Sequence, residues 1–327
     1  MVQLSTEYMG LSLSNPLVVA SSGLTNRVEG VVNCANAGAG AVVLKSLFEE
    51  QIQAETEELQ EHSWILGHPE AFEYVRGMGM DLGPREYLKL IEDSKKAVSV
   101  PVIASLNCIS PKWWVSYAKQ IEAAGADGLE LNISVMPSNP DRTGKQIEEL
   151  HFRIFEEVRD RIRIPIAVKM GPYFTSIARI AEEFGRRGAG ALVLFNRFYQ
   201  LDIDTEKLEI TRGYRFSTPE EMNFTLRWIA LLAGRTSCHL AASTGVHDGA
   251  AVVKQLLAGA TVVQICSTLY IHGIDRIGGI LRDVETWMRR HRYSSVEQIR
   301  GKLSQTESDR PELYERLQYI QALVGIE

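Results

Sequence analysis

The sequence predicts an α/β protein built as a (β/α)8 barrel, the TIM-barrel architecture. Three observations lead to this prediction. Eight short apolar runs are spread along the chain, stretches with helical spacing separate most of them, and the same Gly-Ala junction recurs where a helix gives way to the next run. Parallel strands covered on both faces have near-continuous apolar sequences, and eight of them close a barrel.

The eight runs are rich in Val, Ile, Leu and Ala, and Gly, Pro, Asp or Asn flanks each of them. They are PLVVAS (16–21), AVVLKS (41–46), PVIASLN (101–107), GLELNIS (128–134), PIAVKMG (165–171), ALVLFN (191–196), HLAAS (239–243) and VVQICS (262–267). An open doubly wound sheet is the alternative architecture. Its fingerprint, Gly-x-Gly-x-x-Gly directly after a strand, follows none of the eight runs, which favours the barrel.

Helical spacing is clearest over residues 112–127, 175–190 and 248–261, and each of these stretches ends near a glycine. Glycine commonly ends helices because it adopts the left-handed conformation without a steric penalty. The junctions GAGAVV, GADGLE, GAGALV and GATVVQ place a glycine, an alanine and an apolar run in the same order. This repetition indicates successive helix-strand units.

Two connections, residues 47–100 and 197–238, are too long for simple loops and predict long insertions after strands 2 and 6. In a barrel, insertions that follow the strands lie over the active-site mouth. The first insertion carries six Glu between positions 49 and 61, which we interpret as a solvated acidic face. We expect one domain over residues 1–327, with a C-terminal helical tail over about 271–327.

Composition excludes several classes of protein. The chain has 327 residues, 45% hydrophobic and 23% charged, and its 35 basic and 41 acidic residues give a net charge of −6, which argues against nucleic-acid binding. No eighteen-residue apolar run and no secretory signal is found, so no membrane contact is expected. The four cysteines form no Cys-x-x-Cys pair, which indicates a reducing, cytoplasmic protein without a metal site.

The strand ends predict where the chemistry lies, because in a barrel they point into the mouth. Two lysines, Lys45 and Lys169, close otherwise apolar strands, where an unpaired ammonium is costly. Such lysines serve as Schiff-base nucleophiles, phosphate ligands or charges beside a cofactor. Strands 7 and 8 end in STGVHDG and ICSTLY, small residues that suit phosphate binding. Paired acids, metal-ligand spacing and a Gly-x-Ser-x-Gly elbow are all missing from the strand ends, which leaves glycosidase and hydrolase functions unsupported.

These residues together resemble the dihydroorotate dehydrogenase family of FMN-dependent barrels, over nearly the whole chain. Lys45-Ser46 resembles the family's Lys-Ser, Asn132-Ile133-Ser134 its Asn-x-Ser, and Val168-Lys169 its flavin-pairing lysine. Gln264-Ile265-Cys266-Ser267 resembles the phosphate-binding end of strand 8. The resemblance implies hydride transfer from a CH–CH donor, dihydroorotate or a related dihydropyrimidine, to FMN, in pyrimidine biosynthesis. It also implies a soluble electron acceptor and a homodimer, and the match begins at residue 10, without space for a membrane extension.

The resemblance also implies the site residues. Those expected to bind FMN are Ser21, Ser22, Gly23, Lys45, Ser46, Asn107, Asn132, Lys169, Thr244, Gly245, Cys266 and Ser267. Those expected to bind substrate are Lys45, Met78, Gly79, Asn132 and Asn196. A cation beside the flavin stabilises the negative charge that develops when hydride arrives, and Lys169 is expected to supply it. Amide side chains both donate and accept, which suits a planar imide substrate.

The catalytic loop departs from the family pattern. After Asn-x-Ser the family has a Cys or Ser base followed by Pro-Asn, whereas this chain has Val135-Met136-Pro137-Ser138-Asn139. Neither Val135 nor Met136 can accept a proton, so the catalytic candidates are Lys45, Ser138 and Ser134. A related flavoprotein with another substrate or with lost catalysis remains an alternative, as does a lyase or aldolase that forms a Schiff base at Lys45 or Lys169 with a phosphorylated substrate.

Overall fold

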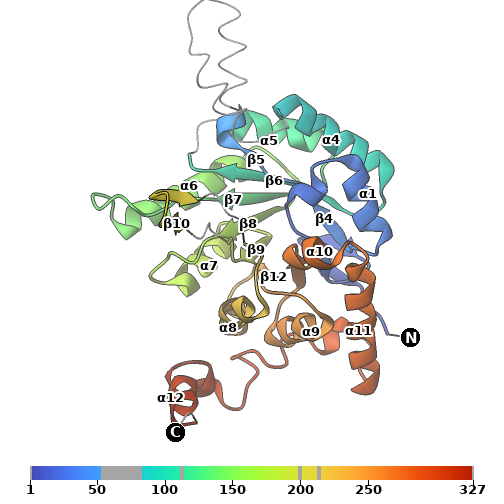
Figure 1. The fold of residues 1–327 in the computed structure, drawn as a ribbon, viewed down its shortest axis with the longest axis vertical. Helices are drawn as coiled ribbons and strands as arrows, with labels where there is room; N and C mark the ends of the chain where they lie inside the picture. The colour runs from blue at the N-terminus through green and yellow to red at the C-terminus, as the bar shows by residue number, and fades with distance from the viewer. Residues whose placement is uncertain (1, 53–82, 111–113, 198–200, 212–214, 326–327) are drawn as a thin grey trace, which may run out of the picture.

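The protein is described by a computed structural model that covers residues 2–52, 83–110, 114–197, 201–211 and 215–325. At its centre the chain forms a closed parallel barrel (Figure 1). Its strands follow one another in chain order: β3 (Leu17–Val19), β4 (Ala41–Val43), β6 (Val102–Cys108), β7 (Gly128–Ile133), β8 (Ile166–Met170), β9 (Ala191–Leu194), β12 (His239–Ser243) and β13 (Val262–Ile265). Pairing of β13 with β3 closes the barrel. Each predicted run coincides with one of these strands, β6 extending one residue beyond its run to Cys108, so the predicted (β/α)8 barrel is confirmed.

Helices cover the outside of the barrel (Figure 1). They are α1 (Val28–Asn36), α4 (Pro84–Ala97), α5 (Trp114–Ala123), α6 (Gly144–Arg159), α7 (Ile177–Arg186), α8 (Met222–Leu232), α9 (Gly249–Ala258) and α11 (Arg276–Arg290). The recurring junction has one geometry throughout. Gly38, Gly125, Gly188 and Gly259 have φ values of +103°, +92°, +91° and +121° and end their helices in the left-handed region. The alanine that follows each glycine is buried, and the strand then begins.

An antiparallel hairpin closes the amino-terminal end of the barrel. Strands β1 (Thr6–Tyr8) and β2 (Leu11–Leu13) are joined by Met9 and Gly10, both with positive φ, as in a type I′ turn. Tyr8 and Met9 are buried among the inward-facing side chains of the strands. The Met9 N–H donates to His239 Nδ1 at 2.9 Å, at the first residue of β12. The sequence analysis did not predict this hairpin.

The two insertions leave the opposite end of the barrel. The first begins with β5 (Leu47–Phe48), which pairs with β6, and the structure describes it again from residue 83. The second contains the exposed hairpin of β10 (Asp202–Asp204) and β11 (Glu209–Thr211), followed by the 3₁₀ turn η2 (Pro219–Glu221). Both insertions therefore start where the sequence predicted.

The C-terminal part contains several helices. It contains α10 (Ser267–His272), α11, the 3₁₀ turns η3 (Val296–Gln298) and η4 (Pro311–Tyr314), and α12 (Arg316–Val324), which lies apart from the barrel in Figure 1. Another 3₁₀ turn, η1 (Gly23–Thr25), follows β3. Among the described helices, none is both long and apolar enough to cross a membrane. The single-domain organisation over residues 1–327 stays a prediction.

Candidate active site

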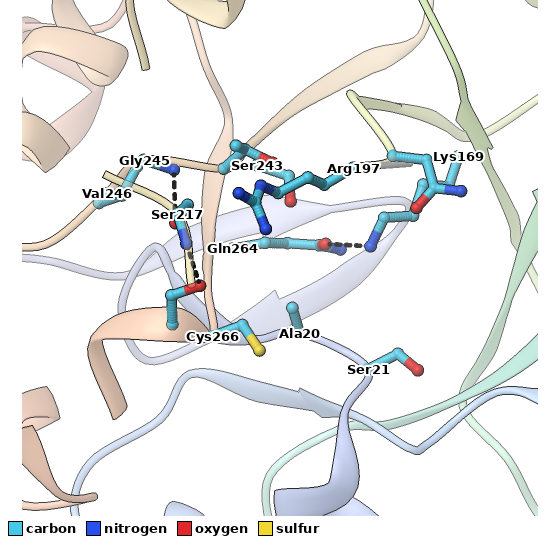
Figure 2. Close-up of a pocket in the computed structure, with 13 residues that line it drawn as sticks. Ala20, Ser21, Lys169, Arg197, Ser217, Ser243, Gly245, Val246, Gln264 and Cys266 are labelled. Carbon is cyan, nitrogen blue, oxygen red and sulfur yellow. Dashed lines mark hydrogen bonds between the residues drawn. The ribbon is translucent and has the colours of Figure 1, made fainter. Parts of the chain in front are cut away.

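The carboxyl ends of the strands surround a cavity of about 110 Å³ (Figure 2). Two cationic side chains, those of Lys169 and Arg197, contribute to its lining, whereas the described lining includes no acidic side chain. The lining residues are Ala20, Ser21, Lys169, Asn196, Arg197, Ser217, Ser243, Thr244, Gly245, Val246, Gln264, Cys266 and Ser267. Each cation is paired with a carboxylate outside this lining, Glu130 and Glu221, so the cavity presents positively charged N–H donors that suit a ligand that carries or develops negative charge.

Lys169 on β8 is held in a buried polar network. Its Nζ lies 3.3 Å from Glu130 Oε1 and 3.2 Å from Gln264 Oε1. Gln264 Nε2 donates to the second carboxylate oxygen of Glu130 at 2.6 Å, which closes the triangle. The side chains of Lys169 and Glu130 are only 9% and 1% exposed. A buried ammonium needs a counter-charge, and Glu130 supplies one from inside the barrel.

Three polar side chains form an amide cluster beside this network. Asn196 Nδ2 donates to Asn132 Oδ1 at 2.9 Å and lies 3.3 Å from Ser134 Oγ. Asn132 pairs in register with Lys169 on β8 and with Asn107 on β6. The strands thus bring Asn107, Asn132 and Lys169 into register at the barrel mouth, and Asn196 joins them through Asn132; their binding roles stay a prediction.

Hydroxyl groups line the side of the mouth formed by β3, β4 and β6. Ser46 Oγ lies 3.0 Å from Ser21 Oγ and 2.8 Å from the buried Ser105 Oγ, and the Ser46 N–H donates to Ser21 at 2.8 Å. Tyr87 OH accepts from the Ser105 N–H at 2.7 Å and fixes the far end of this row. The neighbouring Lys45 is partly buried, and its side chain forms no hydrogen bond or ion pair with any described residue. Lys45 does not line the cavity.

The loops after β12 and β13 form the opposite wall. Ser217, from the second insertion, joins them: its N–H donates to Ser267 Oγ at 3.1 Å, and its Oγ accepts from the Gly245 N–H at 3.3 Å. Gly245 has a φ of +74°, and an added Cβ would lie 2.3 Å from Met222 N. Only glycine fits there. The hydroxyl groups and small side chains at this place suit an anion such as a phosphate.

Thr244 and Cys266 complete this wall. Thr244 adopts a φ of +80°, which costs a non-glycine residue about 1 kcal/mol, and its hydroxyl lies 3.4 Å from the Phe195 carbonyl oxygen. Cys266 precedes α10, and burial raises the pKa of its thiol, while a hydrogen bond with Ser22 and the charge of Lys169 partly oppose that shift. Both side chains therefore have local partners.

Ser22 and Gly23 connect the first strand to this wall. Ser22 Oγ accepts from the Leu24 N–H at 3.3 Å and begins η1. An added Cβ on Gly23 would lie 2.9 Å from the Tyr270 hydroxyl on α10, so glycine permits the close approach of these two segments.

The catalytic candidates in the loop are less favourably placed. Ser138 is exposed and lies outside the cavity lining, and its N–H donates to the Met136 carbonyl at 2.9 Å. Val135 packs against the hydrophobic core. Ser134 is the third member of the amide cluster, beside Asn196. Met78 and Gly79, expected to bind substrate, lie outside the described residues.

The polar residues of the site that the expected set lacked include Glu130, Arg197 and Ser217, and Gln264 was expected only as the beginning of the segment that ends strand 8. A signal was present for Glu130, because an acid two residues before Asn132 in a buried strand faces the same side of the sheet. Ser217 gave none, since it lies in an irregular connection far from any strand end.

The chain is similar to curated proteins along most of its length. It is 28% identical over 314 residues to the dihydroorotate dehydrogenase B (NAD(+)) catalytic subunit of Methanothermobacter thermautotrophicus, covering 91% of this chain and 97% of that protein. Proteins of the same name from Thermoplasma acidophilum and Pyrococcus furiosus are both 25% identical, each match covering 92% of this chain and 99% and 98% of the respective relative. The model of the dihydroorotate dehydrogenase family matches residues 3–288. The chain therefore belongs to the dihydroorotate dehydrogenase family, as the residues at its strand ends indicated.

Proposed function

We propose that this protein is an FMN-dependent oxidoreductase that transfers hydride between a small cyclic amide, dihydroorotate or a related dihydropyrimidine, and the flavin. The observation that carries the proposal is the buried Lys169 ammonium, fixed between Glu130 and Gln264 and open to the cavity. A fixed cation in a low-dielectric site stabilises negative charge that develops beside it. Membership of the dihydroorotate dehydrogenase family supports the same reaction class.

The residues of the cavity fit a flavin mononucleotide. The wall of Ser217, Gly245 and Ser267 offers hydroxyl groups and small side chains to a phosphate, while the Ser217 and Gly245 N–H groups donate within the wall, to Ser267 Oγ and Ser217 Oγ. Gly23 and Gly245 stand where an added Cβ would collide with neighbouring atoms, so the segments around them approach closely without side chains filling the space. The lining offers two cations and, among its described members, no carboxylate that would repel a phosphate.

When bound, FMN supplies hydride acceptance at its ring. The chain's own residues would hold the two reactants. Lys169 would stabilise the charge that develops on the flavin, and its network with Glu130 keeps it in place. Asn132 and Asn196 would orient the substrate, since amide groups match the alternating donors and acceptors of a planar imide. Ser21 and Ser46 would contact the cofactor from the side formed by β3 and β4.

A different substrate within the same chemistry is a second candidate. Val135 packs into the core where the family has its proton acceptor, and Ser138 is exposed. This arrangement favours a substrate whose oxidation does not need a loop base at that position. A Schiff-base reaction at Lys169 is disfavoured, because its Nζ is held between Glu130 and Gln264 in the buried network.

One experiment tests the cofactor and the substrate separately. The protein is purified and examined for a flavin absorption band, and dihydroorotate is then added without oxygen. Bleaching of the band supports both parts of the proposal. A colourless protein that does not take up FMN contradicts it, and a yellow protein that does not bleach supports the second candidate.

A variant pair tests the role of Lys169. Lys169→Ala is expected to weaken FMN binding or slow flavin reduction. Lys95→Ala removes a lysine from a Lys–Asp pair outside the cavity and serves as the control. Equal behaviour of the two variants would contradict the assignment.

NAD⁺ is the first electron acceptor to test, because the relatives are named for it. Sedimentation velocity tests the expected homodimer.

A further inference from the structure

Arg197 is the second cation of the cavity lining, and the proposed function does not use it. It follows Asn196 directly after β9, and its side chain is 16% exposed. Burying most of an arginine side chain at the mouth of a cavity costs desolvation energy, so the guanidinium needs polar partners.

Among the described contacts, Glu221 and the Arg215 carbonyl, both from the second insertion, anchor the guanidinium. Its Nε and Nη2 donate to the two carboxylate oxygens of Glu221 at 2.8 and 3.0 Å, and its Nη1 donates to the Arg215 carbonyl. Such a two-point ion pair fixes the plane of the guanidinium as well as its position. In Figure 2 the side chain of Arg197 points away from Lys169, toward Ser217 and Gly245.

The anchors place Arg197 beside the wall of the cavity. Arg215 and Glu221 flank Ser217 in the chain, and Ser217 joins Gly245 to Ser267. Gly245 also packs on the backbone of Glu221, since an added Cβ would lie 3.0 Å from the Glu221 carbonyl carbon. The segment that holds the guanidinium is therefore the same segment that builds the wall.

We propose that Arg197 binds the phosphate of the flavin mononucleotide, with Glu221 as its positioning residue. This inference rests on the proposed function, because it requires FMN in the cavity. A planar guanidinium binds a phosphate through paired N–H···O bonds and provides a charge that backbone N–H groups lack. Lys169 and Arg197 then serve different parts of one ligand, the ring and the phosphate.

The test compares two flavins that differ only in the phosphate. Flavin-free protein is titrated with FMN and with riboflavin, and the ratio of the two dissociation constants measures the contribution of the phosphate. Arg197→Met is expected to weaken FMN binding by about tenfold or more and to leave riboflavin binding within about twofold, as expected for a lost charge-assisted contact. Arg187→Met is the matched control, because Arg187 also pairs with two glutamates but does not line the cavity.

The outcomes separate this inference from the proposed function. Wild-type protein that binds neither flavin contradicts the proposed function itself. If wild type and Arg197→Met prefer FMN over riboflavin to the same degree, only the role of Arg197 is contradicted. The same conclusion follows if Arg197→Met loses affinity for both flavins equally. If Arg197→Met does not fold, Arg197→Lys provides the same comparison, because lysine keeps the charge but loses the fork. If Arg197→Lys prefers FMN over riboflavin less strongly than wild type does, the proposal is supported. If its preference equals that of wild type, the proposal is overturned.

Discussion

Glu130→Gln tests whether the buried network stabilises the barrel as an ion pair. The substitution preserves the shape of the side chain and removes the charge that faces Lys169, whose side chain is 9% exposed. Breaking a buried pair by removing one partner costs about 3 to 5 kcal/mol, because the remaining charge stays desolvated. Such a loss is a large part of the roughly 5 to 15 kcal/mol that stabilises a typical folded protein. We therefore expect a marked fall in the free energy of unfolding.

Urea unfolding followed by circular dichroism measures the change. Lys169→Met should cost a similar amount, and the double variant should be less destabilised than the sum of the two, with a coupling of about 1 to 3 kcal/mol. Lys95→Met is the control, because its pair with Asp127 is roughly a quarter exposed and should be worth about 1 kcal/mol or less. A loss below about 1 kcal/mol for Glu130→Gln, or strictly additive effects, would refute the reasoning.

Three further predictions concern stability. Gly245→Ala should destabilise the protein by clearly more than the roughly 1 to 2 kcal/mol that a left-handed alanine costs, because its Cβ would lie 2.3 Å from Met222 N. Gly125→Ala is the control, since the added Cβ there has open space. Equal urea midpoints for the two variants would contradict the prediction. Burial lowers the pKa of His151 from 6.5, so its contribution to stability is full above about pH 6.5 and is lost as the pH falls. His151→Gln should therefore flatten the decline in unfolding free energy between about pH 7.5 and about pH 5. An unchanged slope would argue against this prediction. The Tyr8 hydroxyl is buried without a hydrogen-bond partner among the described residues, so Tyr8→Phe should leave the melting temperature equal or higher, and a clear drop would reveal a hidden partner.

The barrel could be predicted from the sequence because its signals are local. Each strand is a short apolar run, and each of the four Gly-Ala junctions carries its own conformational requirement, which the positive φ values confirm. Lys169, Asn132, Asn196 and Gly245 could be placed because parallel strands deliver their last residues to one end of a barrel.

The remaining features depend on contacts between distant segments. Tyr8 and Met9 belong to a short hairpin whose role appears only when the strands surround it. Ser217 and Glu221 lie in an irregular connection, and their partners Gly245 and Arg197 are 28 and 24 residues away. No local pattern encodes such pairings, and a hydrophobic period cannot reveal a polar contact.

The hairpin at the amino-terminal end also constrains the order in which this barrel is completed during synthesis. The Met9 N–H donates to His239, which is synthesised 230 residues later. At about 5 to 20 residues per second, a ribosome needs roughly 10 to 50 s to bridge that gap. Until then the first strands can pair with one another, but the apolar side of the hairpin has no finished barrel to enter. A nascent chain arrested before residue 239 should therefore expose Tyr8 and Met9 to chaperones, and release beyond it should hide them.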